Sequence, residues 1–193
     1  MRLKILNSGY SVGTKLLFAF IRLVSGQPLP DAARLVFYRP DFYGTPMTAF
    51  TQETMRGPSA WSVGDRELMA AYVAKMNECE FCIKAHSAVA AKAYQDEARV
   101  AAVLTDLETA PIAEPLRATL RLLGKLTRDH TVDVNDMRAV LTAGVSREQI
   151  EDALAVCFAF NTTARLADAF EFHVPGPAGF EAGAKHLLSR GYR

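Results

Sequence analysis

The sequence predicts an all-α fold. Apolar residues recur at the three- and four-residue spacing of helices along most of the 193 residues, whereas the alternation typical of strands never persists. Half of the residues are hydrophobic, and a chain of this length buries a sizeable core. We therefore expect a helical domain over residues 31–193, preceded by a helical N-terminal extension over residues 1–30.

The first elements are punctuated by glycine and proline. Residues 14–25 form an apolar segment closed by Gly26, which predicts a short helix. Residues 31–44 are aromatic and interrupted by proline, and they predict a helix followed by a loop. Residues 46–56 predict another helix that stops at the next Gly-Pro pair.

A helical hairpin is predicted in the central part of the chain. Ser62 or Asp65 starts its first helix. Asn77, with Glu80 three residues later, has the pattern of a capping box for the second helix, which runs to about residue 94. With Asn77 as N-cap, Cys79 takes the second helical position, where free N–H groups and the helix dipole favour a thiolate.

The C-terminal half also reads as helices. Ser146 and Gln149 form another capping-box pattern, which predicts the start of a long helix. Cys157 lies in the apolar interior of that helix and is expected to be a packing residue. Further along, Arg165 and Asp168 are spaced to pair with each other on the helix surface. The helices expected in this half cover residues 97–107, 113–128, 134–143, 147–172 and 181–189.

Charge and cysteine content narrow the class of protein. The 22 Lys and Arg residues and 21 Asp and Glu residues are spread along the chain, so no basic face for nucleic acid is expected. Three cysteines make no disulfide framework and favour a reducing compartment. The apolar run at residues 16–21 is too short to span a bilayer and lacks a signal-cleavage pattern. We expect a cytoplasmic protein without membrane or nucleic-acid partners.

The most informative motif is Cys79-x-x-Cys82-x-x-x-His86. On a helix these three side chains share one face, with Cys82 and His86 one turn apart. Glu67 lies ten residues before Asn77 and His86 nine residues after it, so an antiparallel hairpin brings the carboxylate level with the imidazole. This arrangement predicts a proton relay from Glu67 through His86 to Cys82, directly or through a water.

Three segments resemble the alkylhydroperoxidase D family of the carboxymuconolactone decarboxylase-like superfamily. They are Trp61-Ser-Val-Gly-Asp-Arg-Glu-Leu, the Asn77 to His86 motif and the later Phe160-Asn-Thr-Thr-Ala-Arg-Leu-Ala-Asp-Ala-Phe. The resemblance extends over roughly residues 30–175 and is most specific around residues 61–90. Phe81 departs from the pattern, since the type member has a second histidine there.

The resemblance implies a helical homo-oligomer that reduces peroxides through a reversible disulfide. The sequence leaves dimer, trimer and hexamer open, and the apolar helices around the hairpin lead us to expect a pocket that prefers organic hydroperoxides. By position, Cys82 resembles the thiol that attacks the peroxide and Cys79 the resolving thiol. Glu67 and His86 resemble the family's proton relay. The family implies no bound cofactor, only an external dithiol or thiol-protein reductant.

Other uses of the same residues stay open. The cysteine pair also suits an oxidoreductase that exchanges disulfides with a partner protein. A zinc site from Cys79, Cys82, His86 and Glu67 is disfavoured, because no second ligand pair is visible in the sequence. A non-enzymatic oligomerisation or binding module is a further alternative. Glu67 and His86 alone also suit a thiol-independent decarboxylase or hydrolase, although the lactone decarboxylases are among the family members that lack the cysteine pair.

Overall fold

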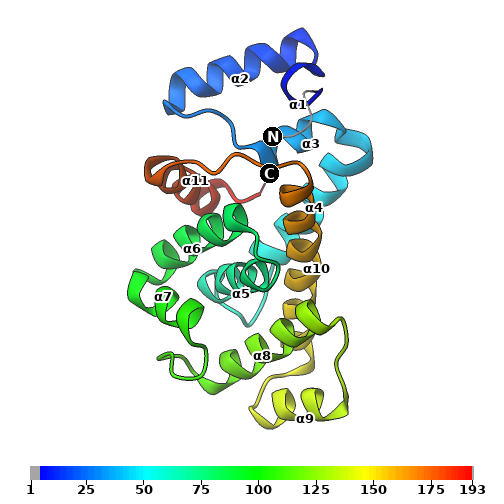
Figure 1. The fold of residues 1–193 in the computed structure, drawn as a ribbon, viewed down its shortest axis with the longest axis vertical. Helices are drawn as coiled ribbons and strands as arrows, with labels where there is room; N and C mark the ends of the chain where they lie inside the picture. The colour runs from blue at the N-terminus through cyan, green and yellow to red at the C-terminus, as the bar shows by residue number, and fades with distance from the viewer. Residues whose placement is uncertain (1–4, 193) are drawn as a thin grey trace.

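The computed structural model describes residues 5–192, and every regular element among them is a helix, which confirms the predicted fold class (Figure 1). Residues 1–4 of the predicted N-terminal extension, and residue 193, lie outside this part. None of the helices in residues 5–192 is long and apolar enough to cross a membrane. The helices are α1 (Ile5–Ser8), α2 (Val12–Ser25), α3 (Asp31–Tyr38), the π-helix η1 (Pro40–Gly44), α4 (Thr45–Arg56), α5 (Val63–Met76), α6 (Glu80–Tyr94), α7 (Glu97–Thr105), α8 (Glu114–Asp129), α9 (Val134–Thr142), α10 (Arg147–Ala169) and α11 (Pro177–Arg190).

Helix α5 is the centre of the fold. It is buried on nearly all sides from Arg66 to Ala74, with α6, α8 and α10 around it (Figure 1). A helix enclosed in this way has no solvent face, and α5 accordingly lacks a polar stripe. The main core gathers side chains from α5, α8 and α10, including Leu68, Leu123 and Val156.

Local signals in the sequence explain several helix ends. The Ser62 hydroxyl accepts a hydrogen bond from the Asp65 backbone N–H, and the Asp65 carboxylate accepts one from the Ser62 backbone N–H, so the predicted start of α5 is a full capping box. Ser146 and Gln149 form the predicted box at the start of α10. Gly26 ends α2 in the left-handed conformation.

Two segments differ from their predicted form. The loop expected after α3 is the π-helix η1, in which the Gly44 N–H reaches back to the carbonyl of Arg39 at 2.9 Å. Gly44 is required there, because a Cβ would lie 2.1 Å from the Val36 carbonyl oxygen. The last helix, α11, starts at Pro177 rather than near residue 181, since proline is well tolerated in the first turn of a helix.

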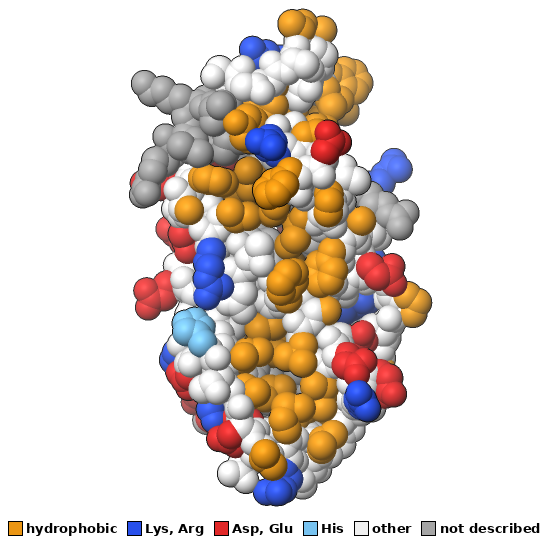
Figure 2. Space-filling model, turned by 90° about the vertical axis from the view of Figure 1, so that its right-hand side faces the viewer, with side chains coloured by type: hydrophobic (Ala, Val, Ile, Leu, Met, Phe, Trp, Pro, Cys, Tyr) orange, Lys and Arg blue, Asp and Glu red, His pale blue; other side chains and the backbone are white. Residues whose placement is uncertain are grey.

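Hydrophobic side chains also gather on the surface. Figure 2 shows them running down one face of the molecule between charged residues. Among the exposed hydrophobics, Phe50 of α4 and Phe158 of α10 meet edge to face with their ring centres 5.4 Å apart. Helix α2 buries none of its side chains and exposes Leu16, Phe20 and Leu23.

Candidate active site

Glu67 and His86 meet across the α5–α6 hairpin. The His86 Nδ1 lies 2.8 Å from the Glu67 Oε2, and both side chains are buried. The two residues come together because they are nearly equidistant from the turn between two antiparallel helices. The sequence-based expectation for this pair agrees with the geometry.

The turn of the hairpin differs from the predicted one. Glu78 has a left-handed backbone (φ 58°), the Cys79 N–H binds the Ala74 carbonyl, and the Glu78 N–H binds the Lys75 carbonyl. This is the Schellman arrangement that ends a helix, so Asn77 is the C-cap of α5 and not the N-cap of α6. The predicted Asn77 capping box is therefore wrong, and the predicted second helical position for Cys79 is wrong with it.

The Asn77 side chain explains why it does not cap α6. Its amide donates to the Val73 carbonyl and to the Asn161 Oδ1, both at 3.0 Å. Cys79 is the N-cap of α6 instead, and Cys82 takes the third helical position. Both thiols still lie at the start of the helix, where the backbone dipole favours negative charge.

The two thiols are buried in a small apolar cluster, separate from the main core. Cys79 is 0% exposed and Cys82 is 1% exposed. Both are free cysteines. Their buried neighbours come from α3, from α5, from α10 and from the segment that follows α10: Leu35, Ala74, Ala164, Ala167 and Phe172. Tyr43 and Phe81, which are partly buried, pack against this cluster. A reagent that reaches either sulfur must displace part of this cover.

The thiol acidities are unequal. A hydrogen bond from the Cys82 thiol lowers the pKa of Cys79, although burial opposes this. The same hydrogen bond, together with burial, raises the pKa of Cys82 far above its ordinary value. The arrangement therefore favours the thiolate form of Cys79 over that of Cys82.

Two further polar side chains lie close to the sulfurs: Tyr43, which packs against the cluster, and the exposed Asp168. Asp168 at the end of α10 acts to raise the pKa of Cys79. Burial raises the pKa of Tyr43 in η1, and the nearby Cys82 adds to the effect. The predicted Arg165–Asp168 pair is absent from the ion pairs of residues 5–192, because Arg165 reaches back one turn to the carbonyl and side-chain oxygens of Asn161.

Two residues that the sequence did not indicate complete the surroundings of Glu67. The Arg56 guanidinium, from α4, donates to the Glu67 Oε1 at 2.7 Å. The Tyr192 hydroxyl donates to the same carboxylate at 3.0 and 3.2 Å. Burial raises the pKa of Glu67, but hydrogen bonds and charge from His86 and Arg56 outweigh it, so the pKa lies below its usual value.

The far side of the imidazole is less constrained. The His86 ring packs edge to face on Phe160, with the centres 4.2 Å apart. Within residues 5–192, no hydrogen bond joins His86 to Cys79 or Cys82, and none is made by its Nε2. The structure thus contains the Glu67–His86 part of the predicted relay, whereas its last step to Cys82 remains a prediction.

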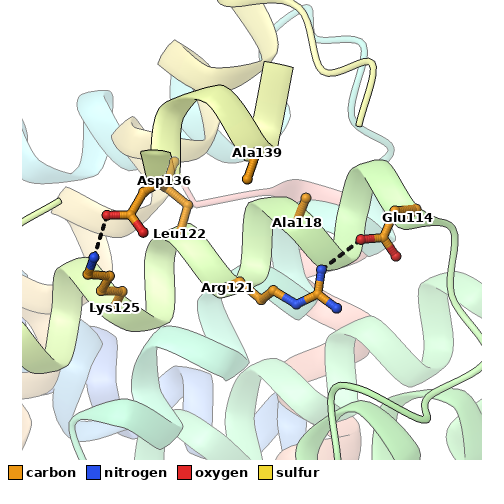
Figure 3. Close-up of a pocket in the computed structure, with 7 residues that line it drawn as sticks. All are labelled: Glu114, Ala118, Arg121, Leu122, Lys125, Asp136 and Ala139. Atoms are coloured by element: carbon orange, nitrogen blue, oxygen red, sulfur yellow. Dashed lines mark hydrogen bonds and ion pairs between the residues drawn. The ribbon is translucent and has the colours of Figure 1, made fainter. Parts of the chain in front are cut away.

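Other possible sites lie away from these residues. A pocket of about 220 Å³ separates α8 from α9, and its charged side chains pair with each other: Arg121 with Glu114 at 2.7 Å, and Lys125 with Asp136 at 2.5 Å (Figure 3). Across residues 5–192, no three His, Cys, Asp or Glu side chains are grouped as metal ligands would be. Cys157 is buried in the main core, as expected for a packing residue.

Comparison with known proteins links this site to a family. Residues 40–125 match the model of the carboxymuconolactone decarboxylase family, and this segment contains the whole α5–α6 hairpin. The family segment also includes Arg56, whereas Tyr192 lies outside it. No curated protein matches the chain significantly.

Solved structures show the same fold over nearly the whole chain. An uncharacterized peroxidase-related protein from Silicibacter sp. TM1040 is 22% identical, with a TM-score of 0.76 and 92% of each chain covered. An uncharacterized peroxidase-related protein from Ralstonia eutropha JMP134, described as an alkylhydroperoxidase AhpD core, is 19% identical, with a TM-score of 0.75. That match covers 91% of this chain and 92% of the other. The chain thus has the AhpD-like helical fold.

Proposed function

We propose that this protein is a thiol-dependent peroxidase that reduces organic hydroperoxides. The observation that supports it best is the hairpin itself, which places a free thiol pair at the start of α6 and a buried carboxylate–imidazole pair one turn further on. Thiols, a proton acceptor and a group that orients the acceptor are the parts that such chemistry requires. The peroxidase-related names of the two structural neighbours agree with the proposal.

In the proposed cycle, the Cys82 sulfur attacks the hydroperoxide. The O–O bond breaks, Cys82 becomes a sulfenic acid, and the alkoxide leaves as an alcohol after taking a proton. The Cys79 thiolate then displaces hydroxide from the Cys82 sulfenic acid, giving the disulfide and, after protonation, water. An external dithiol reduces the disulfide and restores both thiols, with no bound cofactor.

The proposed cycle requires a group that accepts the proton of Cys82. Because the pKa of Cys82 is raised, Cys82 must give up its own proton before it attacks. His86, one turn along the same face of α6 and oriented by Glu67, is the proposed acceptor. Both thiols are buried, so peroxide entry also requires movement of the side chains that cover them.

The test is consumption of an organic hydroperoxide by the full chain with a dithiol reductant. Cys82→Ser should abolish turnover, and Cys157→Ser is the matched control, because Cys157 is also buried but lies in the main core. A wild-type protein without turnover would refute the proposal. Turnover that survives in Cys82→Ser would refute the role of Cys82.

A second candidate is thiol-independent acid–base chemistry by Glu67 and His86. It is favoured by one observation: within residues 5–192, the His86 Nδ1 lies 2.8 Å from Glu67 and 3.4 Å from the Tyr192 hydroxyl, and His86 hydrogen-bonds to neither thiol. The family's name refers to a decarboxylase. Such an enzyme would keep its activity when Cys79 and Cys82 are both replaced by serine, whereas the peroxidase would lose it.

Assembly with further copies of the chain is part of the proposal. The exposed Phe50–Phe158 contact and the apolar side chains of α2 are surfaces that a second copy would cover. Light scattering on a size-exclusion column measures the mass directly. A monomer at micromolar concentration would contradict the proposed homo-oligomer.

A further inference from the structure

The Glu67 carboxylate is the meeting point of three other elements. Arg56 approaches its Oε1 from α4, and His86 approaches its Oε2 from α6. Tyr192, which follows α11, bridges both oxygens. Glu67 is 0% exposed, so water does not compete for these positions. Each carboxylate oxygen thus has donors on defined sides, and the orientation of the group is set by the protein.

Tyr192 is itself held in place. Its backbone N–H donates to the Gln52 side chain at 2.7 Å. The Arg56 guanidinium lies over its ring, 5.1 Å from the ring centre, and also donates to the Leu187 carbonyl at 3.1 Å. These contacts fasten the end of α11 to α4, so the hydroxyl has little freedom to turn away from Glu67.

The hydroxyl acts as a donor in this position. Burial and the neighbouring Glu67 charge raise the pKa of Tyr192 well above its ordinary value, so the phenol keeps its proton. Its distance to the His86 Nδ1 is 3.4 Å, longer than either contact with the carboxylate. Tyr192 therefore donates to Glu67, and Glu67 has an acceptor position left for the His86 Nδ1–H.

We propose that Arg56 and Tyr192 are positioning residues, which hold Glu67 ionised and oriented so that His86 carries its proton on Nδ1 and presents Nε2 as a base. The inference rests on the proposed function only for the transfer of the Cys82 proton to the His86 Nε2. The groups facing Glu67 are Arg56 from α4, His86 from α6 and Tyr192 after α11, and its neighbour on α5 is Arg66. Tyr192 lies outside residues 40–125, which match the family model, whereas Arg56, Glu67 and His86 lie within them.

The first readout is independent of peroxide. The chain has four histidines, and long-range proton–nitrogen NMR spectra of the ¹⁵N-labelled full chain report the tautomer of each. His86→Gln identifies the His86 signals by their loss. We expect the Nδ1–H form alone in the wild type, and a measurable Nε2–H fraction or exchange broadening in Tyr192→Phe.

Tyr94→Phe is the matched control. The Tyr94 hydroxyl also donates to a carboxylate on α5, that of Asp65, at 2.6 Å. Within residues 5–192, no hydrogen bond joins Tyr94 to either thiol or to His86. The control removes a comparable hydrogen bond, and we expect the His86 tautomer and the catalytic constants to be unchanged.

The second readout is turnover. General acid–base catalysis contributes about 10²–10⁴-fold, and a positioning residue accounts for part of it, so Tyr192→Phe should lower kcat about tenfold at an unchanged KM. An altered tautomer in Tyr192→Phe but not in Tyr94→Phe, with an inactive wild type, would support this inference and refute the peroxidase. An unchanged tautomer in Tyr192→Phe would overturn the inference, whatever the activity.

Discussion

Replacing Arg56 by methionine should destabilise the protein strongly at neutral pH. The Arg56 side chain is 12% exposed and its partner Glu67 is fully buried. Removing one partner of a buried ion pair leaves an uncompensated charge, which typically costs about 3–5 kcal/mol. Hydrogen bonds from Arg56 to the Met55 and Leu187 carbonyls are lost as well. With a typical total stability of about 5–15 kcal/mol, the loss is a large fraction.

The loss should also depend on pH. Arg56 is among the groups that hold the pKa of Glu67 below its ordinary value. A carboxylate with a depressed folded-state pKa contributes stability above its unfolded pKa, and this contribution is lost as the pH falls through the folded-state pKa. Without Arg56, Glu67 takes up a proton more readily in the folded state. The difference between wild type and variant should therefore be largest near neutral pH and shrink on acidification.

Urea denaturation at a series of pH values measures this effect. Arg147→Met is the matched control, since the Arg147–Glu151 pair is largely exposed and contributes little. Adding Glu67→Gln to Arg56→Met should recover part of the loss, because the unpaired charge is removed. A loss below about 1 kcal/mol, or one that is independent of pH, would refute the reasoning on the buried pair.

Three further results are expected. Gly44→Ala should lower the free energy of unfolding, measured with urea, by about 2 kcal/mol, because the new methyl group meets the Val36 carbonyl. Gly183→Ala, at an open position of α11, should raise it by about 0.5 kcal/mol. Equal effects of the two variants would contradict the η1 geometry. Glu78→Gly should raise the free energy of unfolding by about 1 kcal/mol, because glycine adopts the left-handed backbone conformation without strain. Gln95→Gly, at the other end of α6, should have the same effect. A lower free energy of unfolding in both variants would show that neither conformation is strained. All three cysteines should react slowly with a thiol-specific disulfide reagent in the folded protein and fast in urea, and fast labelling without urea would contradict their burial.

Local patterns carried much of the prediction. The apolar spacing identified the helices of the core, and the capping signals at Ser62 and Ser146 located the starts of α5 and α10. These signals act within one turn of the chain, so sequence alone contains them. The opposition of Glu67 and His86 followed in the same way, because one tight turn separates their helices.

The predicted capping role of Asn77 is wrong because two helices compete for one residue. Its sequence neighbours fit a capping box, but the Schellman turn at Glu78 and the contact with Asn161, 84 residues away, assign it to the end of α5. A local pattern cannot choose between two local solutions when a distant side chain decides the balance.

The sequence by itself determined an all-α chain whose hairpin carries Cys79, Cys82, His86 and Glu67 on facing helices. Only the tertiary structure decided what surrounds them: the apolar cover that buries both thiols, and the contacts of Arg56 and Tyr192 with the carboxylate. Tyr192 is 125 residues from Glu67 in the chain, so no helical period or cap relates them. Their contact exists because packing α4 and α11 against the hairpin buries a charge that must then be paired.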